Sequence, residues 1–127
     1  MFKVLVVEDD NDNREILRQQ LKHLGYEVVE ATNGFEGLKQ TEKEKPDLVI
    51  VDIVMPGGMD GAEMAQRVRR DLKMKDLPIL AVTVLFQRED VQSCLDAGCD
   101  AFLSKPITLK GLKEKLDQLL HLAGHQK

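Results

Sequence analysis

Residues 48–52 read Leu-Val-Ile-Val-Asp, which is four apolar side chains in a row followed by a carboxylate. A continuous apolar run of this length, rich in β-branched residues, is typical of a β-strand that is covered on both faces. Similar short apolar runs recur along the chain. Further strands are predicted over residues 3–7, 26–31, 78–84 and 101–104.

Between these strands the apolar residues return at helical spacing. Ile16, Leu17, Leu21 and Leu24 share one face before Gly25 ends the pattern. Five β-then-α units with short links need right-handed crossovers, which predicts an α/β fold whose parallel sheet has helices on both faces. The first helix contains these four residues and ends before Gly25, and the other helices are predicted over residues 35–43, 62–72, 88–97 and 108–122, the last with Thr108 as its N-cap.

The composition fits a single ordered domain. The chain has 127 residues, which predicts one domain over residues 1–124 and a frayed tail at 125–127. No apolar run is long enough to span a bilayer and no secretion signal is present, so we expect a cytoplasmic protein without membrane insertion. The formal net charge of −4 argues against direct binding of nucleic acid. Cys94 and Cys99 lack metal-ligand spacing and are expected to be reduced structural thiols.

Polar residues follow the predicted strands where each strand ends. Glu8 and Asp9 come after the first strand, Asp52 ends the third, Thr83 lies late in the fourth, and Lys105 follows the fifth. In a parallel sheet these carboxyl ends share one edge, where ligands of such folds bind. We therefore expect these side chains to form one site.

The residue types at this edge favour metal-assisted phosphoryl chemistry. Converging carboxylates repel one another unless a cation neutralises them, and oxygen ligands alone suit Mg²⁺ or Mn²⁺. A carboxylate beside a metal, a lysine and a hydroxyl is suited to attack on phosphorus, because the cations offset charge on the phosphoryl oxygens. The expected product is an aspartyl phosphate on Asp52, with Lys105 and Thr83 contacting the phosphoryl oxygens.

The ordered set of Val-Val-Glu8-Asp9, Asp52-Ile-Val-Met55-Pro56, Thr83 and Lys105-Pro106 resembles the receiver domain of bacterial two-component response regulators, of the chemotaxis-regulator kind. The resemblance covers nearly the whole chain. It implies a flavodoxin-like, doubly wound, five-stranded parallel sheet of order 2-1-3-4-5 with five helices in three layers. It also implies a histidine kinase or histidine phosphotransfer protein as donor, and a downstream protein partner at the surface of the fourth helix, fifth strand and fifth helix.

The resemblance assigns roles to individual residues. Asp52 matches the phosphoacceptor, Asp9 the direct metal ligand, and Glu8 the second acidic partner, which acts through water. The remaining matches are the Val54 carbonyl as a metal ligand, Thr83 as the switch hydroxyl, the Val84 backbone and Lys105 at the phosphoryl group, Phe102 as the aromatic that turns inward, and Pro106 after a cis peptide bond.

Several positions depart from the family pattern. The loop after the acceptor contains Gly57 and Gly58, one glycine more than usual. Val84 stands where receivers commonly have a small residue, and Val54 and Leu85 are apolar where faster-hydrolysing relatives often carry side chains that orient water. We therefore expect the chain to promote its own phosphorylation and to lose the phosphoryl group slowly, without being an enzyme in the ordinary sense.

Other functions fit the residues less well. A phosphorylation-independent interaction module of receiver shape is the alternative, supported only by Val84 and the extra glycine. A calcium loop starting at Asp9 would need glycine where Arg14 stands. A phosphatase of the haloacid dehalogenase type would need a second aspartate where Val54 stands.

Overall fold

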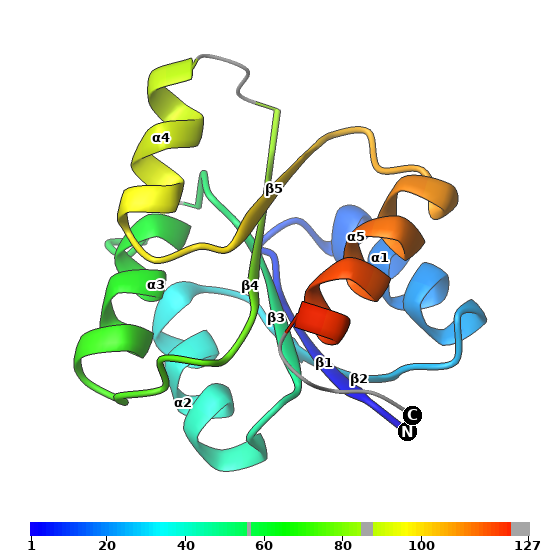
Figure 1. Cartoon of the computed structure of the whole chain (residues 1–127), viewed down its shortest axis with the longest axis horizontal. Helices are drawn as coiled ribbons and strands as arrows, with labels where there is room; N and C mark the ends of the chain where they lie inside the picture. The colour runs from blue at the N-terminus through cyan, green and yellow to red at the C-terminus, as the bar shows by residue number, and fades with distance from the viewer. Residues whose placement is uncertain (56, 85–87, 123–127) are drawn as a thin grey trace.

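The computed structural model describes residues 1–55, 57–84 and 88–122, and strands and helices alternate along these ranges (Figure 1). Within them, no helix has the length and apolar character needed to cross a membrane. Pro56, Leu85 and the tail at 125–127, all subjects of sequence predictions, lie outside the described residues. The elements are β1 (Lys3–Val7), α1 (Asn11–His23), β2 (Glu27–Ala31), α2 (Gly34–Glu44), β3 (Leu48–Asp52), α3 (Gly61–Arg70), β4 (Ile79–Thr83), α4 (Arg88–Asp96), β5 (Ala101–Ser104) and α5 (Leu109–Leu122).

The strands form one parallel sheet in the order β2-β1-β3-β4-β5. Val7 of β1 pairs with Val51 of β3, and Asp52 of β3 pairs with Val82 of β4. The carboxyl ends of these three strands therefore lie at nearly the same level. The predicted flavodoxin-like fold and its strand order are confirmed.

The sheet is the middle layer of three. Figure 1 shows α1 and α5 over one face and α2, α3 and α4 over the other. Along β3, Leu48 and Ile50 pack in the core beneath α1 and α5, while Val49 and Val51 pack in the opposite core. Each such buried side chain contributes about 1.5–3 kcal/mol, and side chains on both faces explain why this strand has no polar alternation.

Several predicted elements differ by one or two residues from their bounds in the structure, and the first helix begins at Asn11, well before the apolar stripe that indicated it. Two of these differences have a clear physical reason. The fourth strand was predicted over residues 78–84, but Pro78 and Val84 are not part of it, because strand pairing covers only Ile79–Thr83. The third predicted helix begins one residue earlier and ends two residues earlier than expected, since the side chain of Asp60 caps it. The predicted N-cap of α5 is confirmed, because the Thr108 hydroxyl accepts an N–H from the first turn of the helix.

Helix α4 ends in a Schellman motif that contains both cysteines. The N–H of Cys99 donates to the Cys94 carbonyl at 3.0 Å, and the N–H of Gly98 donates to the Leu95 carbonyl at 3.0 Å. Gly98 has φ of 115°, a conformation that favours glycine. Both cysteines are buried and neither forms a disulfide bond, in agreement with the prediction of structural thiols. Burial raises the pKa of Cys99 to about 12.

Arg69, at the end of α3, ties the two loops that flank β4. Its guanidinium donates to the carbonyls of Met74 and Leu77, both at 2.7 Å, on the α3–β4 connection. It also donates to the Gly98 carbonyl at 2.7 Å and to the Asp100 carboxylate at 2.8 Å, on the α4–β5 connection. The carboxyl end of α4 is thereby fixed to the carboxyl end of α3.

Replacing Arg69 with methionine should lower the free energy of unfolding by about 2–4 kcal/mol, because partly buried carbonyls lose a charged donor. Urea denaturation followed by circular dichroism measures this loss. The matched control is Arg70→Met, since Arg70 is exposed and pairs only with its neighbour Asp71 among the described ion pairs; it should change stability by less than about 0.5 kcal/mol. Equal effects of the two substitutions would contradict the role given to Arg69.

The thiol of Cys99 should react very slowly with iodoacetamide in the folded protein near neutral pH. Because the thiolate is the nucleophile, raising the pKa from 9.0 to about 12 reduces its population about a thousandfold. Alkylation should accelerate as pH rises toward that value, and it should be fast in the urea-unfolded chain. Mass spectrometry of timed samples measures both rates, and rapid alkylation of the folded chain would show that burial does not protect this cysteine.

Candidate functional site

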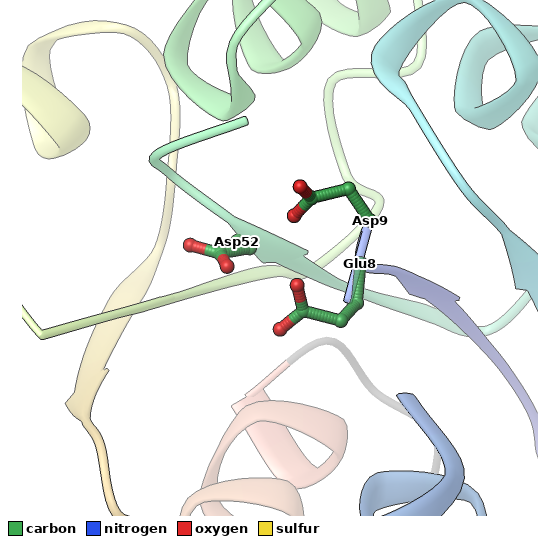
Figure 2. Close-up of side chains that lie close together, drawn as sticks. All are labelled: Glu8, Asp9 and Asp52. Carbon is green, nitrogen blue, oxygen red and sulfur yellow. The ribbon is translucent and has the colours of Figure 1, made fainter. Parts of the chain in front are cut away.

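Three carboxylates meet at the carboxyl ends of β1 and β3 (Figure 2). Glu8 and Asp9 directly follow β1, and Asp52 is the last residue of β3. The pairing of Val7 with Val51 places the next residue of each strand, Glu8 and Asp52, side by side. One carboxylate oxygen from each of the three residues lies within 4.8 Å of the others. Glu8 and Asp52 are buried, while Asp9 is exposed.

Lys105 joins two of these carboxylates. Its Nζ atom donates to Oε1 of Glu8 and to Oδ2 of Asp52, both at 2.8 Å. Burial lowers the pKa of Lys105, but the hydrogen bonds that its ammonium donates to Asp52 and Glu8 outweigh this effect, so its pKa is raised above the ordinary value. The ammonium therefore remains charged and partly compensates the buried carboxylates.

Main-chain N–H groups hold the other oxygens of the buried carboxylates. The N–H of Val54 donates to Oδ1 of Asp52 at 3.1 Å, and the N–H of Asp10 donates to Oε2 of Glu8 at 3.2 Å. Asp10 is also the N-cap of α1, so the start of this helix lies against the acidic group. Both buried side chains are thus fixed in orientation before any ligand binds.

The site carries more negative charge than Lys105 can neutralise, since one ammonium faces three carboxylates. Partial burial raises the pKa of Asp9, and the neighbouring Glu8 carboxyl raises it further. A divalent cation would remove this repulsion, and an all-oxygen donor set suits a hard ion such as Mg²⁺ or Mn²⁺. The residues present therefore fit a metal ion of this class.

Thr83 and Val84 lie at the end of β4, beside the acidic group. Thr83 is buried and pairs with Ser104 of β5, and the N–H of Lys105 donates to the Thr83 carbonyl at 3.0 Å. Val84 is 64% exposed and lines a cavity of about 480 Å³ together with Glu8 and Lys105. The predicted proximity of the fourth and fifth strand ends to the carboxylates is thereby confirmed.

Phe102 lies farther back on β5. It pairs with Ala81, two residues before the end of β4, and its side chain is half-buried. Ala101 and Leu103 pack toward α1 and α5, so strand alternation places Phe102 on the α4 side of the sheet. Its predicted coupling to Thr83 stays a prediction. The peptide bond between Lys105 and Pro106 is cis, as the resemblance implies.

Gly61 is a residue at the site whose role sequence reasoning missed. A Cβ atom added there would lie 2.5 Å from the Asp52 carbonyl oxygen and 2.9 Å from the Ile53 Cα atom. The N–H of Gly61 donates to the Ile53 carbonyl at 3.1 Å. Only glycine lets α3 begin this close to the end of β3, a requirement that no periodicity in the sequence reveals.

Arg14 is a second residue that sequence reasoning missed. Its guanidinium donates to the Glu8 carbonyl at 2.9 Å. One signal was available in the sequence, since a cation in the first turn of a helix is disfavoured by the helix dipole and needs another reason to be there.

Comparison with known proteins agrees with this geometry. Residues 4–117 match the model of the response regulator receiver domain. The chain is 36% identical over 119 residues to chemotaxis protein CheY-3 of Vibrio cholerae, covering 93% of this chain and 91% of that protein. It is 42% identical over 113 residues to sensor histidine kinase RcsC of Salmonella typhi, covering 89% of this chain. In that kinase the matched region is 12% of the length.

Solved structures give the same result. Chemotaxis protein CheY4 of Vibrio cholerae superposes with a TM-score of 0.89 at 34% identity, over 94% of this chain and 99% of that one. A CheY-like receiver domain protein from Methanospirillum hungatei superposes with a TM-score of 0.90 at 29% identity, over 100% of this chain and 99% of that one. The chain therefore belongs to the response regulator receiver domain family of two-component systems.

Proposed function

We propose that this chain is a Mg²⁺-dependent phosphoacceptor that receives a phosphoryl group on Asp52 from a phosphohistidine of a histidine kinase or histidine phosphotransfer protein. The observation that carries the proposal is the contact of Asp52 with Lys105 at 2.8 Å, within a group of three carboxylates. A strand-terminal aspartate held this way has a cation beside it that can offset negative charge on a phosphoryl group. Membership of the receiver family supports the same role.

In the proposed transfer, a carboxylate oxygen of Asp52 forms a bond to phosphorus while the bond between phosphorus and the donor imidazole nitrogen breaks. The electron pair of the broken bond stays on the imidazole nitrogen, which takes a proton from solvent. Lys105 remains charged and donates to the phosphoryl oxygens as negative charge moves toward them. Thr83 donates its hydroxyl to the phosphoryl group, and the Val84 backbone binds the same group.

The metal ligands in this proposal are Asp9 and Asp52 directly, Glu8 through water, and the main-chain carbonyl of Val54. Bound Mg²⁺ supplies positive charge that offsets the carboxylates and the phosphoryl oxygens. Glu8 is anchored by Lys105 and by the N–H of Asp10, so it presents a fixed oxygen. Asp9, which is exposed, is the ligand that solvent and the incoming group can reach.

The donor docks, in this proposal, where the site opens between α1 and the connection from β5 to α5. A cavity of about 480 Å³ there is lined by Leu17, Pro106 and Ile107 as well as by Lys105. Ile16, which also lines this cavity, is 53% exposed. Apolar side chains around a polar centre suit a protein donor better than a small hydrophilic one.

The response to phosphorylation is proposed to reach a protein partner at the surface of α4, β5 and α5, with Phe102 turning inward as Thr83 moves. The hydrogen bond from the Lys105 N–H to the Thr83 carbonyl joins the two strand ends that face the phosphoryl group. Leu95 of α4 and Leu109 of α5 are both partly exposed, at 41% and 37%. These side chains give the surface the apolar contacts that a protein partner requires.

Treatment with acetyl phosphate and Mg²⁺ should add one phosphoryl group to the chain, detected by intact-protein mass spectrometry under mild conditions. Asp52→Asn should abolish the addition, because the amide is a poor nucleophile. Asp60→Asn, which changes an exposed capping carboxylate, should leave it intact, and chelation of Mg²⁺ should prevent it. An unmodified native chain that shows no Mg²⁺-dependent change would instead support the alternative, a phosphorylation-independent interaction module.

The phosphoryl group, once formed, should be lost slowly. Val54 and Val84 present exposed apolar side chains at the site, 54% and 64% accessible, so neither can orient an attacking water. Changing Val84 to alanine and Leu85 to asparagine together should shorten the phosphoryl lifetime by about tenfold or more. Decay is followed by mass spectrometry after removal of acetyl phosphate, with Val28→Ala on the edge strand β2 as control. An unchanged lifetime in the double variant would refute the explanation.

A further inference from the structure

We propose that Arg14 is a positioning residue that holds the acidic pair Glu8 and Asp9 in the arrangement that binds Mg²⁺. The inference rests on the proposed function, since it concerns the metal site that function requires. Arg14 lies in the first turn of α1, and its side chain is only 16% exposed. A cationic side chain that is this deeply buried needs hydrogen bonds or ion pairs to compensate for the loss of solvation. The partners of Arg14 therefore indicate its role.

Each part of the Arg14 guanidinium has a partner. Nη1 donates to the Glu8 carbonyl at 2.9 Å, and Nη2 donates to Oδ1 of Asn11 at 2.6 Å. Nε lies 3.3 Å from the Glu30 carboxylate on β2. The planar fork is therefore fixed by three elements at once: the end of β1, the start of α1 and the edge strand β2. Few other rotamers could satisfy these partners together.

The Glu8 carbonyl matters because it belongs to the peptide that joins the two acidic residues. β1 ends at Val7, so Glu8 lies just beyond the last ladder residue, although its N–H still donates to the Ala31 carbonyl at 3.0 Å. The peptide unit is planar, so holding its carbonyl oxygen also fixes the direction in which the Asp9 Cα atom leaves it. Arg14 thereby sets the orientation of Asp9 relative to Glu8.

Asp9 is the carboxylate that needs this support. Glu8 is held by Lys105 and the Asp10 N–H, and Asp52 by Lys105 and the Val54 N–H. Asp9 is exposed, and its carboxyl lies beside that of Glu8, which repels it. Without a fixed peptide, the Asp9 side chain would turn away from Glu8 into solvent, and metal binding would have to reverse this turn.

Arg14 does not act as a counter-ion to the acidic group. Its charge is paired with Glu30 on β2, and none of its described hydrogen bonds or ion pairs is to the carboxylates of Glu8, Asp9 or Asp52. The helix dipole also disfavours a cation at this end of α1. The hydrogen bonds of Arg14, rather than its charge, therefore explain why an arginine stands at this position of α1. Because Arg14 binds the main-chain carbonyl of Glu8, the carboxylate oxygens stay available for a metal ion.

The test is calorimetric titration of the whole 127-residue chain, unphosphorylated, with MgCl₂. Arg14→Met keeps the length of the side chain but removes every donor, and should weaken Mg²⁺ binding about tenfold or more, as is usual when a residue that orients a metal ligand is lost. Arg14→Lys keeps one donor group and should recover part of the affinity. Arg18→Met is the matched control, because Arg18 is also on α1 and pairs with Glu15; it should bind Mg²⁺ like the native chain.

Urea denaturation of each variant separates positioning from folding. A merely structural role would lower stability while leaving Mg²⁺ affinity unchanged in the folded chain. If Arg14→Met does not fold, Glu30→Gln and Arg14→Lys carry the test, and each should weaken binding severalfold by loosening the guanidinium or its substitute. Native-like affinity in the folded Arg14 variants would overturn the proposal for Arg14 alone. Absence of Mg²⁺ binding by the native chain would instead overturn the proposed function, so the two failures are distinguishable.

Discussion

Lys105 reaches from the end of β5 past β4 to two buried carboxylates, with Nζ 2.8 Å from an oxygen of each. Placing a charge beneath a protein surface costs several kcal/mol, so Glu8 and Asp52 depend on this shared ammonium. The compensation is incomplete, because Asp9 adds a third carboxylate to the group. The remaining negative charge suits the site to a divalent cation. Under the proposed function, a new charge on Asp52 would act directly on the shared ammonium.

The strand order and the register of the sheet together make the contact between Lys105 and Asp52 possible. The order β1-β3-β4-β5 puts exactly one strand between Asp52 and Lys105, a gap that a lysine side chain can span. The register is equally restrictive, since β3 is buried on both faces and a slip by one residue would exchange its two cores. Gly61 completes the arrangement by letting α3 begin directly against the end of β3.

The sequence predicts the parts of this structure that follow from local patterns of apolar and polar residues. The apolar run at 48–52 indicates a doubly covered strand, and the polar residues at strand ends indicate where the site lies, because both follow from local patterns. The bounds of β4 were less predictable. Val84 is a β-branched residue of the type that favours strands, but the pairing of β4 with β5 ends at Thr83. The roles of Arg14 and Arg69 were not predicted, because the bonds that define them are to main-chain carbonyls, and carbonyls are the same at every position of a sequence.

These two arginines fix different parts of the molecule. Arg14 holds the peptide that carries the acidic pair, whereas Arg69 holds the carboxyl end of α4 through the Gly98 carbonyl and Asp100. A cavity of about 370 Å³ lies beside α4, lined by Val54, Ser93 and Cys94 among others, so the helix has room next to the acceptor loop.

A helix fixed at its carboxyl end, with space along its side, can move most at its amino end. That end follows β4, whose last residue is Thr83. Under the proposed function, Thr83 contacts the phosphoryl group, so the part of α4 with most freedom is also the part nearest the chemistry. The bond from Arg69 to a main-chain carbonyl does not involve any group that gains or loses charge on phosphorylation. Under the proposed function, we therefore expect this end to keep its contacts when Asp52 is phosphorylated and the response to be concentrated at the amino end of α4.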